Sequence, residues 1–284
     1  MIRQRMKLKR FFNIIFSLAF LTAGAQNVTQ TVQIADRFME TGRFSSAAKY
    51  YQRAYFFADK KDIPLIRGKM ADAFFMKHDF QRAAKYYDQA VKFETDDTLR
   101  SEWFLKKISA EIMQKKFNLA LLETLNYRGK FTLRQEKNKN FLLGTAYYGL
   151  EKFDAAKQKF LSALPENDSL HRAALNALFS PKNLNRPRPE IARWMSIFVP
   201  GLGQAYAGDW KNAANSFFLN GLLVWLMLRD MANVGFINAF VGVFPWLQRY
   251  YVGGYERAEN IARQKRMEKR AKTFRKIKTL IYAR

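Results

Sequence analysis

The sequence predicts an all-α fold, and three observations carry that prediction. Blocks with a phenylalanine followed three residues later by an alanine recur four times in the first half of the chain, which is typical of repeated helix pairs. Two uncharged apolar runs follow, at residues 213–228 and 231–247. A segment rich in lysine and arginine closes the chain. We therefore expect a helical solenoid, then a small helical membrane module, then a basic C-terminal helix.

Residues 1–25 have the pattern of a secretory signal peptide. A basic start precedes the apolar core at residues 11–21, and Ala23-Gly24-Ala25 supplies the small-x-small cleavage pattern before Gln26. An uncleaved signal anchor is the alternative. In either case we expect the residues that follow to lie on the exported, periplasmic side.

Four blocks define the repeat region. Their phenylalanines are Phe44, Phe80, Phe117 and Phe153, at intervals of 36, 37 and 36 residues. The alanines three residues later allow two helices to approach closely, and aromatic residues four positions beyond them, such as Tyr51 and Tyr87, would fill the groove between the helices. The third copy is weaker, because Glu111 and Thr124 stand where large residues are expected.

These blocks resemble the tetratricopeptide repeat, whose usual period is about 34 residues, although its usual tryptophan is missing. The resemblance implies antiparallel helix pairs stacked in a right-handed superhelix over residues 27–180, with a protein or peptide partner on the concave face. The candidate partner-binding residues are polar positions of the first helices: Arg37, Arg67, Lys77 and Asn140. The alternative for each of these residues is an ordinary position on a solvent-exposed polar face.

The repeats are expected to end in a capping helix at residues 170–179. We then expect a stiff linker at residues 181–190. Its first nine residues, PKNLNRPRP, include three prolines, and proline disfavours regular structure.

Residues 191–255 predict a membrane-embedded helical module. Pro200 and Gly201 would end its first helix. Each of the two apolar runs is near 16 residues, while a spanning helix needs roughly 20, so the flanking aromatic residues would have to extend them. A pair of buried helices in a water-soluble domain is the alternative.

The module carries a motif of the form S-x-x-x-P-G-x-G-Q-x-Y-x-G at residues 196–208. Its members are Pro200, Gly201, Gly203, Gln204, Tyr206 and Gly208, followed by Asn220 in the next helix. The motif resembles a small bacterial integral-membrane family of uncharacterised activity, often joined to helical repeats, and more distantly the two-span TM2 type of domain. The resemblance implies a location in a bacterial cell membrane and no known activity.

The net charge of +25 suggests a nucleic-acid or anionic-lipid partner. Much of it lies in the basic tail, residues 256–284. An export signal makes nucleic acid an unlikely partner. Lysine and arginine beside membrane spans favour the cytoplasmic side, so we expect a cytoplasmic tail and an odd number of crossings, with residues 191–206 as a third embedded segment.

No reaction is predicted. The chain has no cysteine and only two histidines, His78 and His171, and it shows no catalytic triad or phosphate-binding loop. We therefore expect no enzymatic activity, no cofactor and no metal. The expected function is a membrane-anchored scaffold or adaptor of the cell envelope that binds a protein or peptide. The alternative is a nucleic-acid- or anionic-lipid-binding protein that acts through its tail.

Overall fold

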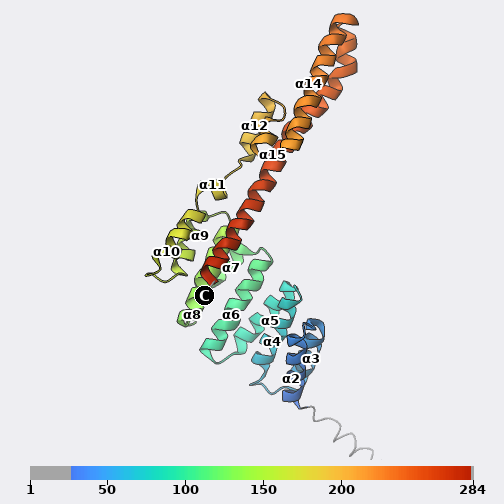
Figure 1. Cartoon of the computed structure of the whole chain (residues 1–284). Coiled ribbons are helices and arrows are strands. Elements are labelled where there is room, and N and C mark those ends of the chain that lie inside the picture. Colours follow the sequence, from blue (N-terminus) through green and yellow to red (C-terminus); the bar gives the residue numbers. More distant parts are fainter. Residues whose placement is uncertain (1–26, 283–284) are drawn as a thin grey trace, which may run out of the picture. The chain divides into compact units, whose positions relative to one another are not determined.

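The computed structural model describes residues 27–282, and every regular element in that range is an α-helix, which confirms the all-α prediction. The signal peptide expected at residues 1–25 lies outside the described residues. The chain divides into two compact units at the boundary between Pro165 and Glu166 (Figure 1).

The first unit consists of four consecutive helix pairs. These are α2 (Val28–Glu40) with α3 (Phe44–Phe57), α4 (Ile63–Met76) with α5 (Phe80–Phe93), α6 (Asp97–Met113) with α7 (Phe117–Asn126), and α8 (Leu133–Gly149) with α9 (Phe153–Ser162). Helices adjacent in sequence pack on one another. The second helix of every pair begins at the recurring phenylalanine, so the repeat blocks mark the starts of these helices.

Small residues explain the close approach of the paired helices. Ala47, Ala83 and Ala156 are fully buried at the start of their helices. The aromatic side chains that follow, including Tyr51 and Phe160, are buried as well. Such alternation of small and large side chains allows a core to pack without voids.

The turn inside each pair has one conformation. The second residue after each first helix adopts the left-handed conformation, with φ of 71° at Gly42, 62° at His78, 61° at Lys115 and 60° at Glu151. In each turn this residue and the next donate hydrogen bonds to carbonyl groups of the preceding helix, as in a Schellman motif. Glycine adopts this φ without strain, and the other three residues do not.

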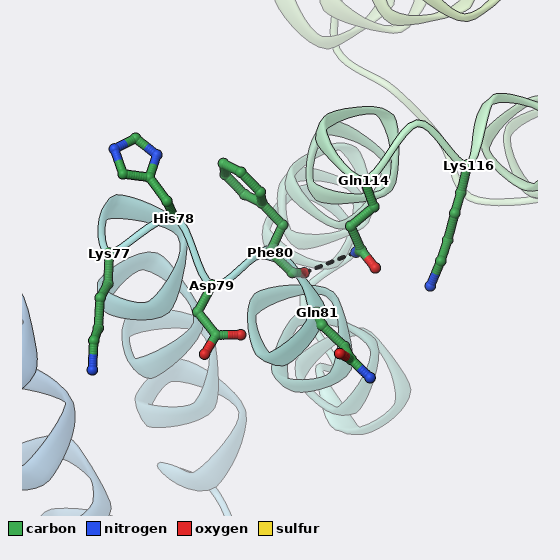
Figure 2. A pocket seen from close by; sticks show the side chains of 7 residues that line it. All are labelled: Lys77, His78, Asp79, Phe80, Gln81, Gln114 and Lys116. Carbon is green, nitrogen blue, oxygen red and sulfur yellow. Dashed lines mark hydrogen bonds between the residues drawn. The ribbon is translucent and has the colours of Figure 1, made fainter.

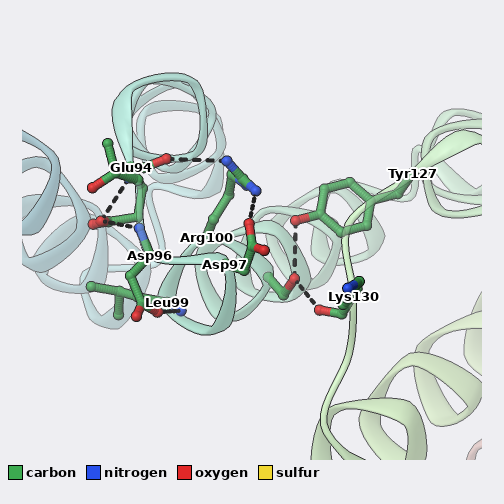
Figure 3. Close-up of polar contacts among 9 residues, drawn as sticks. Glu94, Asp96, Asp97, Leu99, Arg100, Tyr127 and Lys130 are labelled. Carbon is green, nitrogen blue, oxygen red and sulfur yellow. Dashed lines mark hydrogen bonds and ion pairs between the residues drawn. The ribbon is translucent and has the colours of Figure 1, made fainter.

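The third repeat departs from the others, as its sequence predicted. Thr124 replaces the large aromatic residue, and its hydroxyl donates to the carbonyl oxygen of Ala120 at 2.6 Å. Tyr127 from the following loop compensates, because its ring stacks on Phe104 with the centroids 3.8 Å apart. Ser101 fixes the loop by donating to the carbonyl oxygen of Lys130 at 2.7 Å and by bonding to the Tyr127 hydroxyl at 3.1 Å (Figure 3).

The second unit is organised along one helix. Its elements are α10 (Ser169–Leu178), α11 (Pro181–Leu184), α12 (Pro189–Phe198), α13 (Leu202–Tyr206), α14 (Trp210–Asn233) and α15 (Phe236–Tyr282). Helix α15 has 47 residues. Helix α14 turns back along its first half, α12 and α13 pack beside its middle, and α10 and α11 pack on its C-terminal part.

Several expectations for this unit need correction. The helix expected at residues 170–179 forms as α10, and it belongs to the second unit, where it packs on α15. The linker 181–190 contains the short helix α11, and Pro189 begins α12, because the first turn of a helix tolerates proline. The basic segment from residue 256 is the second half of α15 and not a separate element.

The segment 191–206 also differs from the single kinked crossing that we expected. The structure divides it into α12, of ten residues, and α13, of five. In the part of the chain that the structure describes, no helix combines the length and the apolarity that a membrane-crossing segment requires.

Candidate functional site

The four predicted partner-binding residues come from the first helices of three different pairs. Arg67 lies at the start of α4, where its guanidinium group is 5.0 Å from the ring centroid of Tyr55 and 5.1 Å from that of Phe93. Lys77 lies at the opposite end of the same helix. Arg37 is on α2, and Asn140 is on α8, where its Nδ2 donates to a backbone carbonyl. Arg67 is thus held by aromatic packing, and Lys77 lines a hollow.

A repeated polar network, which sequence reasoning missed, connects successive pairs. The Tyr51 hydroxyl donates to Asp36 Oδ1 at 2.5 Å, and Lys69 Nζ lies 2.7 Å from Asp36 Oδ2. Burial, with the hydrogen bond to Asp36, raises the pKa of Tyr51, so its hydroxyl stays a donor. The next repeat has the same arrangement in Asp72, Tyr87 and Lys106. The spacing of 36 or 37 residues between equivalent members was a signal that could have revealed it.

Lys77 helps to line a groove at the turns of the second and third repeats (Figure 2). The lining residues are Lys77, His78, Asp79, Phe80, Gln81, Gln114 and Lys116. Gln114 Nε2 donates to the carbonyl oxygen of Phe80 at 2.9 Å, so it ties the third repeat to the second. Figure 2 shows that Gln81 and Lys116 project toward the same side.

A second hollow adjoins this groove and shares Gln81, Gln114 and Lys116 with it. We call the two hollows together the repeat groove. In the second hollow, Lys107 Nζ lies 2.6 Å from Glu123 Oε2 and 2.9 Å from Asp88 Oδ1. Burial opposes the charged ammonium group, but the hydrogen bonds to Glu123 and Asp88 outweigh it and raise the pKa of Lys107.

Glu111 is the unusual member of this cluster. Its side chain is 5% exposed, and its Oε1 lies 3.9 Å from Lys107 Nζ, beyond hydrogen-bonding distance. Its Oε2 has no hydrogen-bond partner in the described part of the chain. Burial, followed by repulsion from Glu123, raises the pKa of Glu111 to about 7. The carboxyl group therefore gains or loses its proton near neutral pH.

The motif of residues 196–208 folds into a junction between α12, α13 and α15. The Ser196 hydroxyl donates to Gln204 Oε1 at 2.9 Å and accepts from the Gly203 N–H at 3.0 Å. Gln204 Nε2 donates to the carbonyl oxygen of Gly254 at 2.9 Å. A side chain on Gly203 would place its Cβ 1.8 Å from the carbonyl oxygen of Ala192, so only glycine fits.

The other motif residues also have structural roles. Gly201 has φ of 95°, and a Cβ there would lie 2.3 Å from the carbonyl oxygen of Ala213. The Tyr206 hydroxyl accepts from the Arg188 N–H at 3.1 Å. Pro200 stands in the break between α12 and α13, and Gly208, with φ of 83°, precedes α14. The motif thus makes a tight packing junction.

Asn220 lies on α14, away from that junction. It is 3% exposed, and its Nδ2 donates to the carbonyl oxygen of Ser216 at 2.7 Å. Its Oδ1 and the Ser216 Oγ lack a hydrogen-bond partner within the described residues. Asn220 therefore makes one amide hydrogen bond locally, one turn back on its own helix.

Beyond the junction, α14 and the start of α15 form a hairpin with an unusual surface. We call residues 213–247 the apolar hairpin; its only charged residues are Arg229 and Asp230, near the turn. Phe218 is 72% exposed, Ile237 75% and Val241 70%. Further exposed apolar side chains are Phe217, Leu222, Val224, Trp225, Leu228, Val234, Phe236, Phe240 and Trp246. A group of exposed apolar side chains of this kind is typical of an interaction site.

No family model, curated protein or solved structure matches this chain.

The function is therefore inferred from the repeat groove, the motif junction and the apolar hairpin. Within residues 27–282, no group of three or more histidine, aspartate or glutamate side chains is placed to hold a metal ion. The groove offers amide, ammonium and carboxyl groups for hydrogen bonding, and the hairpin offers apolar surface. Both are candidate binding surfaces.

Proposed function

We propose that this chain is a membrane-attached scaffold of the bacterial cell envelope. In this proposal the apolar hairpin enters the bilayer, and the first unit, a tetratricopeptide-like solenoid, binds a protein or peptide partner. The observation that carries the proposal is the exposed apolar surface of residues 213–247, bounded by the charged half of α15.

Two properties of the hairpin favour its burial in hydrocarbon. Its backbone polar groups are satisfied inside two helices, as hydrocarbon requires. Transfer of its aromatic and aliphatic side chains out of water is favourable by about 25 cal/mol per Å². The uncharged part of α14, residues 213–228, rises about 24 Å at 1.5 Å per residue, against a hydrocarbon core of about 30 Å. Arg229 and Asp230 would then approach the far headgroups.

A hairpin returns the chain to the side from which it entered. Helices α10 and α11 precede the hairpin, and both pack on the basic half of α15 that follows it. Arg270 Nε donates to the carbonyl oxygen of Leu184 at 2.7 Å across this contact. This packing supports a tail on the same side as residues 166–190, in place of the cytoplasmic tail expected from the positive-inside rule.

The hairpin is tested with the triple variant Phe218→Gln, Ile237→Gln and Val241→Gln. We expect the purified variant to stop floating with phosphatidylcholine vesicles, while the wild type floats. A matched control replaces three exposed leucines of the first unit, Leu122, Leu125 and Leu133, with glutamine. Equal flotation of both variants would overturn membrane insertion. A wild type that stays with the soluble fraction and forms hairpin-dependent dimers would identify a second copy as the occupant.

The side of the tail is tested by thiol labelling, since the chain has no cysteine. Leu170→Cys and Lys278→Cys place one thiol before the hairpin and one after it. We expect a membrane-impermeant reagent applied to the exported side to label both. Labelling of position 170 alone would show that the chain crosses the membrane between them.

The partner surface is tested by a photo-crosslinking amino acid at Lys77 or Gln81 of the repeat groove. We expect both positions to give an adduct of one mass, because they line one groove. The same amino acid at Lys159, on α9, is the control. Adducts of equal yield at all three positions would show that the groove is not the binding surface.

A further inference from the structure

A cationic pocket lies in the second unit, where the segment around α11, the end of α13 and α15 meet. Its lining includes Lys182, Arg186, Pro187, Tyr206, Gly208 and Lys269, and no carboxylate lines it. We call this the cationic pocket. All its residues come from one compact unit.

The positive charge of this pocket is not neutralised by the protein. Within the described residues, Lys182, Arg186 and Lys269 form no ion pair. Other cations of α15 do have partners, since Arg263 lies 2.7 Å from a carboxylate oxygen of Glu259. An anion that enters the pocket would therefore meet three cations and would not have to displace a carboxylate from any of them.

Two carboxylates adjoin pocket residues in the sequence, and both are engaged. Glu268 precedes Lys269; its Oε1 accepts from Gln264 Nε2 at 3.0 Å, and its Oε2 lies 3.7 Å from Lys265 Nζ. Asp209 follows the pocket residue Gly208 and caps α14. Its two oxygens accept hydrogen bonds from the Asn212 N–H at 3.1 Å and from Asn212 Nδ2 at 2.6 Å. These hydrogen bonds hold the Asp209 carboxylate at the start of α14.

Tyr206 adds a neutral donor to the pocket. Its hydroxyl oxygen accepts from the Arg188 N–H at 3.1 Å, and the hydroxyl hydrogen has no acceptor among the described residues. The pocket thus offers one O–H group beside a guanidinium and two ammonium groups. Arginine presents two N–H groups that match two oxygens of a phosphate, and lysine adds a point charge.

The position of the pocket indicates the source of its ligand. Gly208 lies two residues before α14, whose apolar run begins at Ala213. Trp210, between them, is 73% exposed, and tryptophan prefers the headgroup level of a bilayer. If the hairpin is inserted, the cationic pocket lies at the level of the lipid phosphates.

We propose that the cationic pocket binds the phosphate group of an anionic phospholipid. The proposal rests on the membrane attachment argued above. A zwitterionic headgroup would bring an ammonium group into a pocket that has cations and no carboxylate. The pocket therefore selects anionic over zwitterionic lipids.

The test compares two triple variants that lose the same charge. The pocket variant carries Lys182→Gln, Arg186→Gln and Lys269→Gln. The control carries Arg257→Gln, Arg263→Gln and Lys265→Gln, which lie on α15 between the apolar hairpin and Lys269. Binding to vesicles of phosphatidylcholine, with and without phosphatidylglycerol, gives the preference for the anionic lipid. Circular dichroism confirms that both variants keep their helix content.

We expect the pocket variant to bind phosphatidylcholine vesicles like the wild type and to lose at least about tenfold in its preference for phosphatidylglycerol. The control should keep most of that preference. If the control loses as much of the preference or more, anionic lipid is attracted to the basic residues of α15 in general. That result would overturn the assignment of lipid binding to the cationic pocket. A wild type that binds neither vesicle would refute attachment itself, and the lipid assignment with it.

Inorganic phosphate titrated into the protein in detergent distinguishes a free phosphate from a headgroup. The pocket variant could lose phosphate binding that the control keeps, and yet retain the wild-type preference for phosphatidylglycerol vesicles. This outcome would assign the pocket to a soluble phosphate compound. That result would overturn the lipid assignment. We expect inorganic phosphate to bind far more weakly than the vesicles, because the hairpin holds the pocket at a surface dense in phosphates.

Discussion

The amide nitrogen of Gln204 lies 2.9 Å from the carbonyl oxygen of Gly254, fifty residues further along the chain. The same amide accepts a hydrogen bond from Ser196 through its oxygen. One buried side chain therefore fastens α12 and α13 to α15. Loss of this side chain would leave buried polar groups without partners, which is more costly than the loss of an exposed hydrogen bond.

Replacement of Gln204 by methionine should lower the free energy of unfolding of the second unit by about 1–3 kcal/mol, because it keeps the volume and removes both hydrogen bonds. Tryptophan fluorescence reports on this unit, since four of the five tryptophans, Trp194, Trp210, Trp225 and Trp246, lie in it. Gln248→Met, at an exposed position, is the control. Equal effects of the two changes would contradict the role of the junction.

Gly203→Ala should destabilise the same junction by about 1–3 kcal/mol or more, because the new Cβ would lie 1.8 Å from the Ala192 carbonyl oxygen. Gly253→Ala introduces the same methyl group where no atom lies within 4 Å, so it should be neutral or slightly stabilising. Thermal unfolding in detergent measures both. A stable Gly203→Ala protein would show that the close approach of α12 and α13 is not required.

The repeat helices could be predicted because their signal is local. Phe117 and Phe153 begin their helices for the same reason as Phe44, since the alanine three residues later allows the helices to approach. Helix α15 could not be predicted in the same way. The apolar run suggested one helix and the basic tail another, yet α15 continues through both and includes Pro245. Packing of α10–α14 along it, which is tertiary information, maintains that continuity.

The candidate sites were harder to predict than the fold. Arg67 was selected for its polarity, but the sequence does not show that Tyr55 and Phe93 enclose its guanidinium group. The motif residue Gln204 was identified, but its partner Gly254 lies fifty residues away, and no pattern joins the two. The network of Asp36 and Tyr51 was accessible from the sequence, since it recurs with the period of the repeat.

Lys115→Gly should stabilise the first unit by about 0.5–1 kcal/mol. Lys115 has φ of 61°, a conformation that costs a residue with a Cβ about 1–2 kcal/mol, and the greater freedom of glycine in the unfolded chain offsets part of the gain. Gly42→Ala, at the equivalent turn, should destabilise, although no atom lies within 4 Å of the new Cβ. Denaturant unfolding followed by circular dichroism tests both. Changes of the same sign would refute the conformational argument.

Glu111→Gln should make the stability of the first unit less dependent on pH. Burial raises the pKa of Glu111 to about 7 from an ordinary value of 4.5, so the folded protein holds the proton more tightly than the unfolded chain. The stability gained from the neutral carboxyl is present in full below pH 4.5 and is lost as the pH rises through 7. Glutamine is neutral at every pH, so the variant should be more stable than the wild type at pH 8, by about 1–3 kcal/mol.

That difference should shrink toward zero as the pH falls below about 4.5, where Glu111 is protonated in both the folded and the unfolded protein. Glu40→Gln removes an exposed carboxylate from the same unit and is the control, since it should change stability little at either pH. Other carboxyl groups also titrate in this range, but they are common to wild type and variant and cancel in the comparison. A difference that stays constant from pH 5 to pH 8 would mean that Glu111 is already ionised in the folded repeat groove.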